Sequence, residues 1–226
     1  MADAPVVLVH GLGSSFEHGW RPAGWIDLLA DTRRRVVPVD LLGHGSAPRP
    51  HDPATYAHLD EYLEAALPDE TVDAIGFSLG AQLLLRVAAR APERFAHLVV
   101  IGVGAGVFRD DGRELLANAF EHGVADDDVG GRVFVSLAAE AGNDPLALAA
   151  LLRRPSTPLT TDELAGVTCP VLVIIGDKDF SGPPDELVDA LPNAKLVTLH
   201  NIDHFQATRD FACIDAALDF IGAAFA

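Results

Sequence analysis

Short apolar runs rich in β-branched residues recur along the chain and alternate with segments of helical periodicity. They predict six strands, over residues 6–9, 35–39, 71–75, 97–101, 171–175 and 195–199. The fifth run is apolar at every position, which is typical of a strand covered by helices on both faces. The pattern therefore predicts an α/β fold, with a mainly parallel sheet flanked by helices.

The alternation stops between about residues 107 and 165, where only helical signals occur. Apolar residues at helical spacing predict one helix over 114–121 and another around 133–137. The run Asn143-Asp144-Pro145 predicts the start of a third helix, which ends near residue 152. We therefore predict a core formed by residues 1–106 and 166–226, with residues 107–165 inserted as a small helical lid.

The run Gly76-Phe77-Ser78-Leu79-Gly80 places one serine between a predicted strand and a run of strong helix formers. Glycines two positions before and after a serine permit a tight strand-to-helix turn that leaves the hydroxyl exposed. The start of a helix also favours negative charge beside that hydroxyl. The pattern predicts a nucleophilic serine, although an ordinary glycine-rich connection can contain the same residues.

Composition narrows the classes of partner. Thirty-three acidic and 16 basic side chains among 226 residues give a formal net charge of −17, which would repel nucleic acids and anionic membranes. No stretch is apolar for long enough to span a bilayer. Cys169 and Cys213 lack the spacing of a metal or redox motif, so we expect a cytoplasmic location, while a bridge between them stays open.

A serine nucleophile requires a base, and that base requires an orienting carboxylate. Asp179 follows the fifth predicted strand and His204 follows the sixth, so a parallel sheet would bring both to the edge that carries Ser78. Asp177 competes with Asp179, and His200 competes with His204. We favour the later residue of each pair, Asp179 and His204. His10 and His44 follow earlier strands, and we expect them to stabilise loops by hydrogen bonding.

These motifs resemble those of the α/β-hydrolase superfamily, in particular its capped, carboxylesterase-like serine hydrolases. The resemblance includes the order serine, aspartate, histidine, the run Val9-His10-Gly11-Leu12-Gly13 and the loop at residues 40–46. It implies catalytic roles for Ser78, Asp179 and His204, an oxyanion hole formed by the backbone N–H groups of Leu12 and Leu79, and a lid after the family's sixth-strand region. One departure is Asp203, since glycine usually precedes the catalytic histidine.

No histidine or cysteine spacing typical of a metal site occurs, and no nucleotide-binding motif is present. We therefore expect no cofactor and no metal. The expected activity is hydrolysis of small to medium, largely apolar carboxylic esters through an acyl-enzyme, with a small-molecule substrate. Carbon–carbon bond hydrolysis, lactone opening and perhydrolysis remain open on the same triad, as does a non-catalytic receptor, and the sequence indicates no oligomeric state.

Overall fold

The computed structural model describes residues 4–110 and 112–223. Within these residues, six strands form one sheet in the order β2-β1-β3-β4-β5-β6, and every neighbouring pair is parallel. Each strand overlaps a run predicted above, which confirms the α/β fold with a mainly parallel sheet. The strands are β1 (Val6–Val9), β2 (Val36–Val39), β3 (Val72–Phe77), β4 (Phe95–Ile101), β5 (Val171–Gly176) and β6 (Ala194–Leu199).

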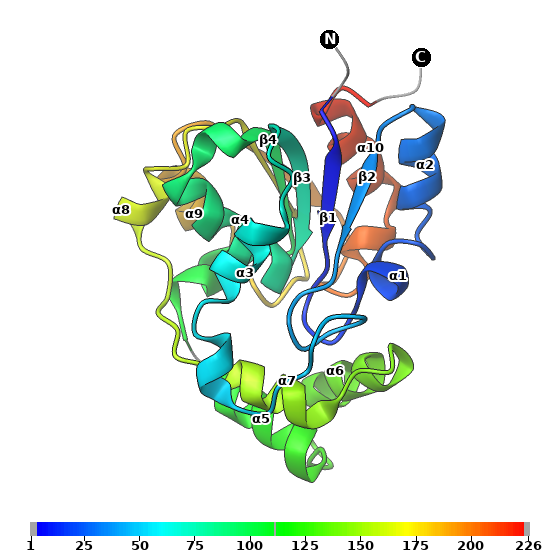
Figure 1. Cartoon of the computed structure of the whole chain (residues 1–226), viewed down its shortest axis with the longest axis vertical. Helices are drawn as coiled ribbons and strands as arrows, with labels where there is room; N and C mark the ends of the chain where they lie inside the picture. The colour runs from blue at the N-terminus through cyan, green and yellow to red at the C-terminus, as the bar shows by residue number, and fades with distance from the viewer. Residues whose placement is uncertain (1–3, 111, 224–226) are drawn as a thin grey trace.

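Helices cover both faces of the sheet (Figure 1). One face carries α1 (Phe16–Gly19), α2 (Trp25–Asp31) and α10 (Phe211–Phe220), and the other carries α3 (Leu59–Ala66), α4 (Leu79–Arg90), α8 (Thr161–Leu164) and α9 (Asp185–Ala190). Along β1, Val7 and Val9 enter one apolar cluster while Val6 and Leu8 enter the other. This two-residue alternation divides the core into two layers.

The helices predicted within residues 107–165 are present as α5 (Arg113–His122), α6 (Val129–Glu140) and α7 (Pro145–Leu152). They lie beyond the carboxyl ends of the strands (Figure 1) and share an apolar cluster that includes Phe120, Ala138 and Leu148. In chain order this segment follows the fourth strand, β4, rather than a sixth, because β5 and β6 both come after it. Residue 111 of the predicted lid, and residues 1–3 and 224–226 of the predicted core, lie outside the described residues.

Four short 3₁₀ helices complete the described elements: η1 (Pro53–Tyr56), η2 (Pro92–Arg94), η3 (Ala105–Phe108) and η4 (Ala207–Arg209). Across residues 4–110 and 112–223, no helix has the length and apolar character that crossing a membrane requires. Cys169 and Cys213 are both buried free thiols, and they belong to different layers of the core. The bridge that the sequence left open is therefore not formed.

Candidate active site

Ser78 occupies the turn between β3 and α4, with φ 51° and ψ −113°. A positive φ is strained for a residue with a side chain, and such strain often marks a functional position. The flanking glycines make the turn possible because the backbone passes so close to them. A Cβ on Gly76 would lie 2.8 Å from the backbone nitrogen of Ala81, and one on Gly80 would overlap the carbonyl oxygen of Val9.

Three side chains that are far apart in the sequence meet at the carboxyl edge of the sheet. The Nε2 atom of His204 lies 3.0 Å from Oγ of Ser78. The Nδ1 atom of the same ring lies 2.9 Å and 3.0 Å from the two carboxylate oxygens of Asp179. Ser78 follows β3, Asp179 follows β5 and His204 follows β6. The fold therefore aligns a hydroxyl, an imidazole and a carboxylate in the geometry of a nucleophile, its base and an orienting acid.

The carboxylate of Asp179 is completely buried, and the His204 side chain is only 2% exposed. Burial alone would raise the pKa of Asp179, but hydrogen bonds from His204 and Ser181 outweigh it and lower that pKa. Ser181 contributes its hydroxyl at 2.7 Å and its backbone N–H at 2.8 Å. The ionised carboxylate holds the proton of His204 on Nδ1, which leaves Nε2 free to accept a proton from Ser78.

The competing residues lie outside this chain of hydrogen bonds. His200 is 86% exposed and pairs with Asp177 at 2.9 Å on the surface. The unusual Asp203 accepts a hydrogen bond from the backbone N–H of Gln206 at 3.0 Å, so its carboxylate stabilises the turn after His204. The sequence analysis missed Ser181, although a serine two positions after an aspartate is a recognisable turn signal.

The two expected oxyanion donors lie beside Ser78 in the chain and in the loop after β1. Leu79 is the first residue of α4, where a backbone N–H has no partner within the helix. Leu12 belongs to the loop at residues 10–15, which passes close to Gly80. Across residues 4–110 and 112–223, neither N–H donates to another backbone group. Both donors are therefore available to a bound oxygen atom.

Comparison with known proteins agrees with this architecture. The model of the α/β-hydrolase fold family matches residues 4–134. The chain belongs to the α/β-hydrolase family. Pimeloyl-(acyl-carrier protein) methyl ester esterase of Neisseria meningitidis is 30% identical to this α/β-hydrolase over 242 aligned positions, which cover 90% of this chain and 88% of that protein.

A second relative, 2-hydroxy-6-oxo-2,4-heptadienoate hydrolase of Pseudomonas putida, is 38% identical over 119 residues. That alignment covers 49% of this chain and only 42% of the relative. Among solved structures, 2-hydroxy-6-oxo-6-phenylhexa-2,4-dienoate hydrolase of a Rhodococcus species superposes with a TM-score of 0.74 at 23% identity, covering 98% of this chain and 91% of that one. Both sequence relatives are hydrolases, which supports hydrolase chemistry, and the superposition supports the fold.

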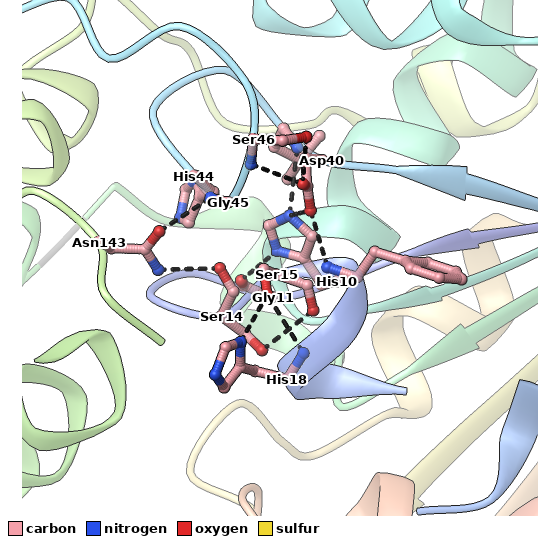
Figure 2. Close-up of polar contacts among 12 residues, drawn as sticks. His10, Gly11, Ser14, Ser15, His18, Asp40, His44, Gly45, Ser46 and Asn143 are labelled. Carbon is pink, nitrogen blue, oxygen red and sulfur yellow. Dashed lines mark hydrogen bonds and ion pairs between the residues drawn. The ribbon is translucent and has the colours of Figure 1, made fainter. Parts of the chain in front are cut away.

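Two buried histidines hold the loops of the α/β-hydrolase site (Figure 2). The Leu41 N–H donates to Nε2 of His10 at 3.1 Å, and the Gly13 N–H donates to Nε2 of His44 at 3.0 Å. An accepting nitrogen carries no proton, so each ring is neutral, with its proton on Nδ1. Burial lowers the pKa of both rings, and the charge of a protonated His10 lowers that of His44 further, to about 3.

Asn143, just before α7, ties the helical segment to the same loops (Figure 2). Its amide nitrogen donates to the carbonyl oxygens of Gly13 at 2.8 Å and Ser14 at 2.9 Å. Its amide oxygen accepts from the Gly45 N–H at 2.9 Å. The sequence analysis treated the Asn143-Asp144-Pro145 run as a helix start alone. Asp144 performs that capping role, since its side chain accepts from Leu146, while Asn143 faces the loops.

Ser78 and His204 border two cavities of the hydrolase. The larger, of about 470 Å³, extends under the helical segment and is lined in part by Leu116, Phe134 and Leu152. The smaller, of about 240 Å³, lies beside the oxyanion loop and includes Leu12 and Trp20. Phe134 of α6 borders both cavities. The Ser78 hydroxyl therefore lies where the two cavities meet.

The structure distinguishes the positions of the two tryptophans, Trp20 and Trp25. Trp20 lines the smaller cavity, while Trp25 is packed in the core and donates from Nε1 to the carbonyl oxygen of Thr208 at 2.8 Å. The Phe180 ring lies 4.4 Å from the His204 ring, centroid to centroid. In the described part of the chain, no three histidine, cysteine, aspartate or glutamate side chains are grouped to hold a metal ion.

Proposed function

We propose that this α/β-hydrolase cleaves carboxylic esters through an acyl-enzyme intermediate. The observation that carries the proposal is the 3.0 Å contact between Ser78 Oγ and His204 Nε2, at the junction of the two cavities. Ser78 is the nucleophile, His204 is the general base and acid, and Asp179 orients the imidazole. The backbone N–H groups of Leu12 and Leu79 form the oxyanion hole.

The reaction uses each group in turn. His204 Nε2 takes the proton of Ser78 as Oγ attacks the ester carbonyl carbon, and the two N–H groups stabilise the negative oxygen, at about 100- to 1000-fold in rate per donor. The imidazolium then gives its proton to the departing alcohol as the carbon–oxygen bond breaks. A water molecule, deprotonated by His204, attacks the acyl-enzyme, and the carboxylic acid leaves as Ser78 regains its proton.

The two cavities provide separate spaces for the acyl and alcohol parts of a small to medium substrate. Leu83, Leu116 and Phe134 in the larger cavity favour a largely apolar chain. We propose that residues 107–165 act as the lid over this chain. The esterase relative, aligned over most of both sequences, supports ester chemistry. We also propose a cytoplasmic location, with which the two free thiols agree.

Carbon–carbon bond hydrolysis is the second candidate. It is favoured by the Pseudomonas putida relative, which has the higher identity of the two but matches less than half of each sequence. The same three side chains would serve this reaction, so their geometry does not separate it from ester cleavage. The difference lies in the substrate that the cavities accept.

The test compares the wild type with Ser78→Ala on p-nitrophenyl esters and on vinylogous diketones. We expect ester turnover and labelling by a fluorophosphonate in the wild type, and loss of both in Ser78→Ala. Ser136→Ala is the matched control, because Ser136 is an exposed serine of α6 whose hydroxyl donates to Glu140 at 3.1 Å. Activity confined to the diketones would replace the ester proposal with the second candidate, and full ester turnover by Ser78→Ala would refute both.

A further inference from the structure

The larger cavity carries an unusual charge for so acidic a protein. Two aspartates, Asp110 and Asp128, line it together with four arginines. The arginines are Arg86, Arg109, Arg113 and Arg154. Among the described residues that line the cavity, four positive and two negative side chains leave a local excess of positive charge, although the whole chain has a formal charge of −17. This wall therefore attracts an anion that most of the surface would repel.

Arg154 is a half-buried member of this wall. Its guanidinium donates to the carbonyl oxygen of Leu151 at 2.9 Å, and among the described residues no carboxylate lies within 4 Å of it. Burial lowers the pKa of Arg154 to about 10, with Arg113 and Arg86 lowering it further by repulsion. The group remains a cation at neutral pH. Asp110 and Asp60 attract this cation from beyond ion-pairing distance. A partly desolvated cation with no direct carboxylate partner among the described residues favours an anionic ligand at this position.

The neighbouring arginines are only partly neutralised. Arg113 pairs with Asp110 at 2.8 Å and donates to the carbonyl oxygen of Arg154 at 2.9 Å, but its Nε–H is buried and has no partner within the described chain. Arg86 donates to the Thr157 carbonyl oxygen, and its nearest carboxylate, on Glu163, is 3.8 Å away. Unused donors therefore remain beside Arg154.

Arg153 is an arginine with a structural role, because its guanidinium binds side chains of α5. It lies next to Arg154 in sequence, yet it does not line the cavity. Its guanidinium pairs with Glu114 at 3.1 Å and Glu121 at 2.5 Å, and it bonds Asn118 at 2.8 Å. Arg153 has three side-chain partners away from the cavity, whereas Arg154 lines the cavity with no carboxylate within 4 Å among the described residues. This contrast favours a binding role for Arg154.

We propose that Arg154, with Arg113 and Arg86, binds a carboxylate at the end of the substrate chain. This inference rests on the proposed ester hydrolysis, because the carboxylate belongs to the molecule that Ser78 cleaves. Guanidinium groups match a carboxylate with paired hydrogen bonds, and the apolar wall at Leu116 and Phe134 suits a methylene chain. The substrate class is therefore a half-ester of a dicarboxylic acid, with the free carboxylate held away from the reacting bond.

The test uses two esters that differ only in charge: the mono-p-nitrophenyl ester of octanedioic acid, and its analogue with a methyl ester at the far end. For each protein we take the ratio of kcat/KM for the charged substrate to that for the neutral one. We expect the ratio to exceed ten in the wild type, and to fall on the order of 10- to 100-fold in Arg154→Ala. Arg153→Ala is the matched control and should keep the wild-type ratio.

Direct binding to the wild type keeps the inference testable even if Arg154→Ala fails to fold. Octanedioate titrated calorimetrically into the wild type should bind at least tenfold more tightly than 1,8-octanediol, and binding should weaken with added salt. Equal binding of the two, or binding of inorganic phosphate but not of octanedioate, would overturn the carboxylate site. Equal kcat/KM for the two esters in the wild type would overturn it as well.

The two proposals fail in different ways. Absence of turnover of both esters, together with absence of fluorophosphonate labelling at Ser78, would refute the proposed hydrolysis. Octanedioate binding would still decide the anion site in that case, because it requires no chemistry. Turnover of the neutral ester with no octanedioate binding would refute the anion site and leave the hydrolysis intact.

Discussion

His44 should make the protein lose stability as the solution becomes more acidic. Its Nε2 accepts the Gly13 N–H at 3.0 Å, so the folded state requires the neutral ring. In the unfolded chain the ring is in water and takes up a proton near its ordinary pKa of 6.5, whereas in the folded state its pKa is about 3. Between these values the unfolded state binds more protons, so the free energy of unfolding falls as the pH falls.

The size of the effect follows from the two pKa values. Between pH 7 and pH 5 the unfolded ring becomes protonated while the folded ring stays neutral, which costs about 2 kcal/mol of stability from this one residue. The loss begins near pH 6.5 and continues towards pH 3 at about 1.4 kcal/mol per pH unit. Burial also lowers the pKa of His10, so that ring acts in the same direction.

Urea unfolding at pH 7 and pH 5 measures this loss in the wild type and in His44→Gln, whose amide oxygen can accept the same N–H but does not titrate. We expect the variant to lose about 2 kcal/mol less than the wild type over this interval. His58→Gln is the control, because the His58 side chain is 75% exposed and remains in water in both states. An identical loss in the wild type and His44→Gln would refute the reasoning.

Three further predictions concern the site. Asp179→Asn should lower kcat by about 10⁴-fold in ester assays, because an amide no longer holds the imidazole in the productive tautomer; a change below tenfold contradicts that role. Asn143→Ala should lower the free energy of unfolding, measured in urea, by about 2–4 kcal/mol, because three hydrogen bonds are lost and the Gly45 N–H is left without its partner. The control Asn118→Ala changes an exposed residue and should lower it by under about 1 kcal/mol. Gly80→Ala should abolish fluorophosphonate labelling in otherwise folded protein, because the new methyl group overlaps the Val9 carbonyl.

The sheet was predictable because its strands are marked locally. The run that forms β5 is apolar from residue 171 to residue 175, which is typical of a strand covered on both faces, and the structure buries all six positions of β5. The order Ser78, Asp179, His204 was also visible, since each residue directly follows a predicted strand or its turn. Parallel pairing then brings all three to one edge, where the contacts are 2.9–3.0 Å.

Features that depend on contacts between distant segments were not predictable. Asn143 reaches loops 98 to 130 positions away, and nothing beside it in the sequence indicates this. The arginines of the larger cavity are spread from residue 86 to residue 154 and only the folded chain gathers them. The choice between Arg153 and Arg154 is the clearest case, because adjacent identical residues point in different directions and only packing distinguishes them.

The position of the helical segment between β4 and β5 has a consequence for how this protein can diversify. The connection between those strands is about 70 residues long. Chain entropy grows only with the logarithm of length, so closing it costs about 2 kcal/mol more than closing a ten-residue link. Evolution or an engineer can therefore replace, shorten or extend α5–α7 at small thermodynamic penalty. Such changes would reshape the larger cavity, which Leu116, Phe134 and Leu152 of these helices line, while the strands keep their pairing.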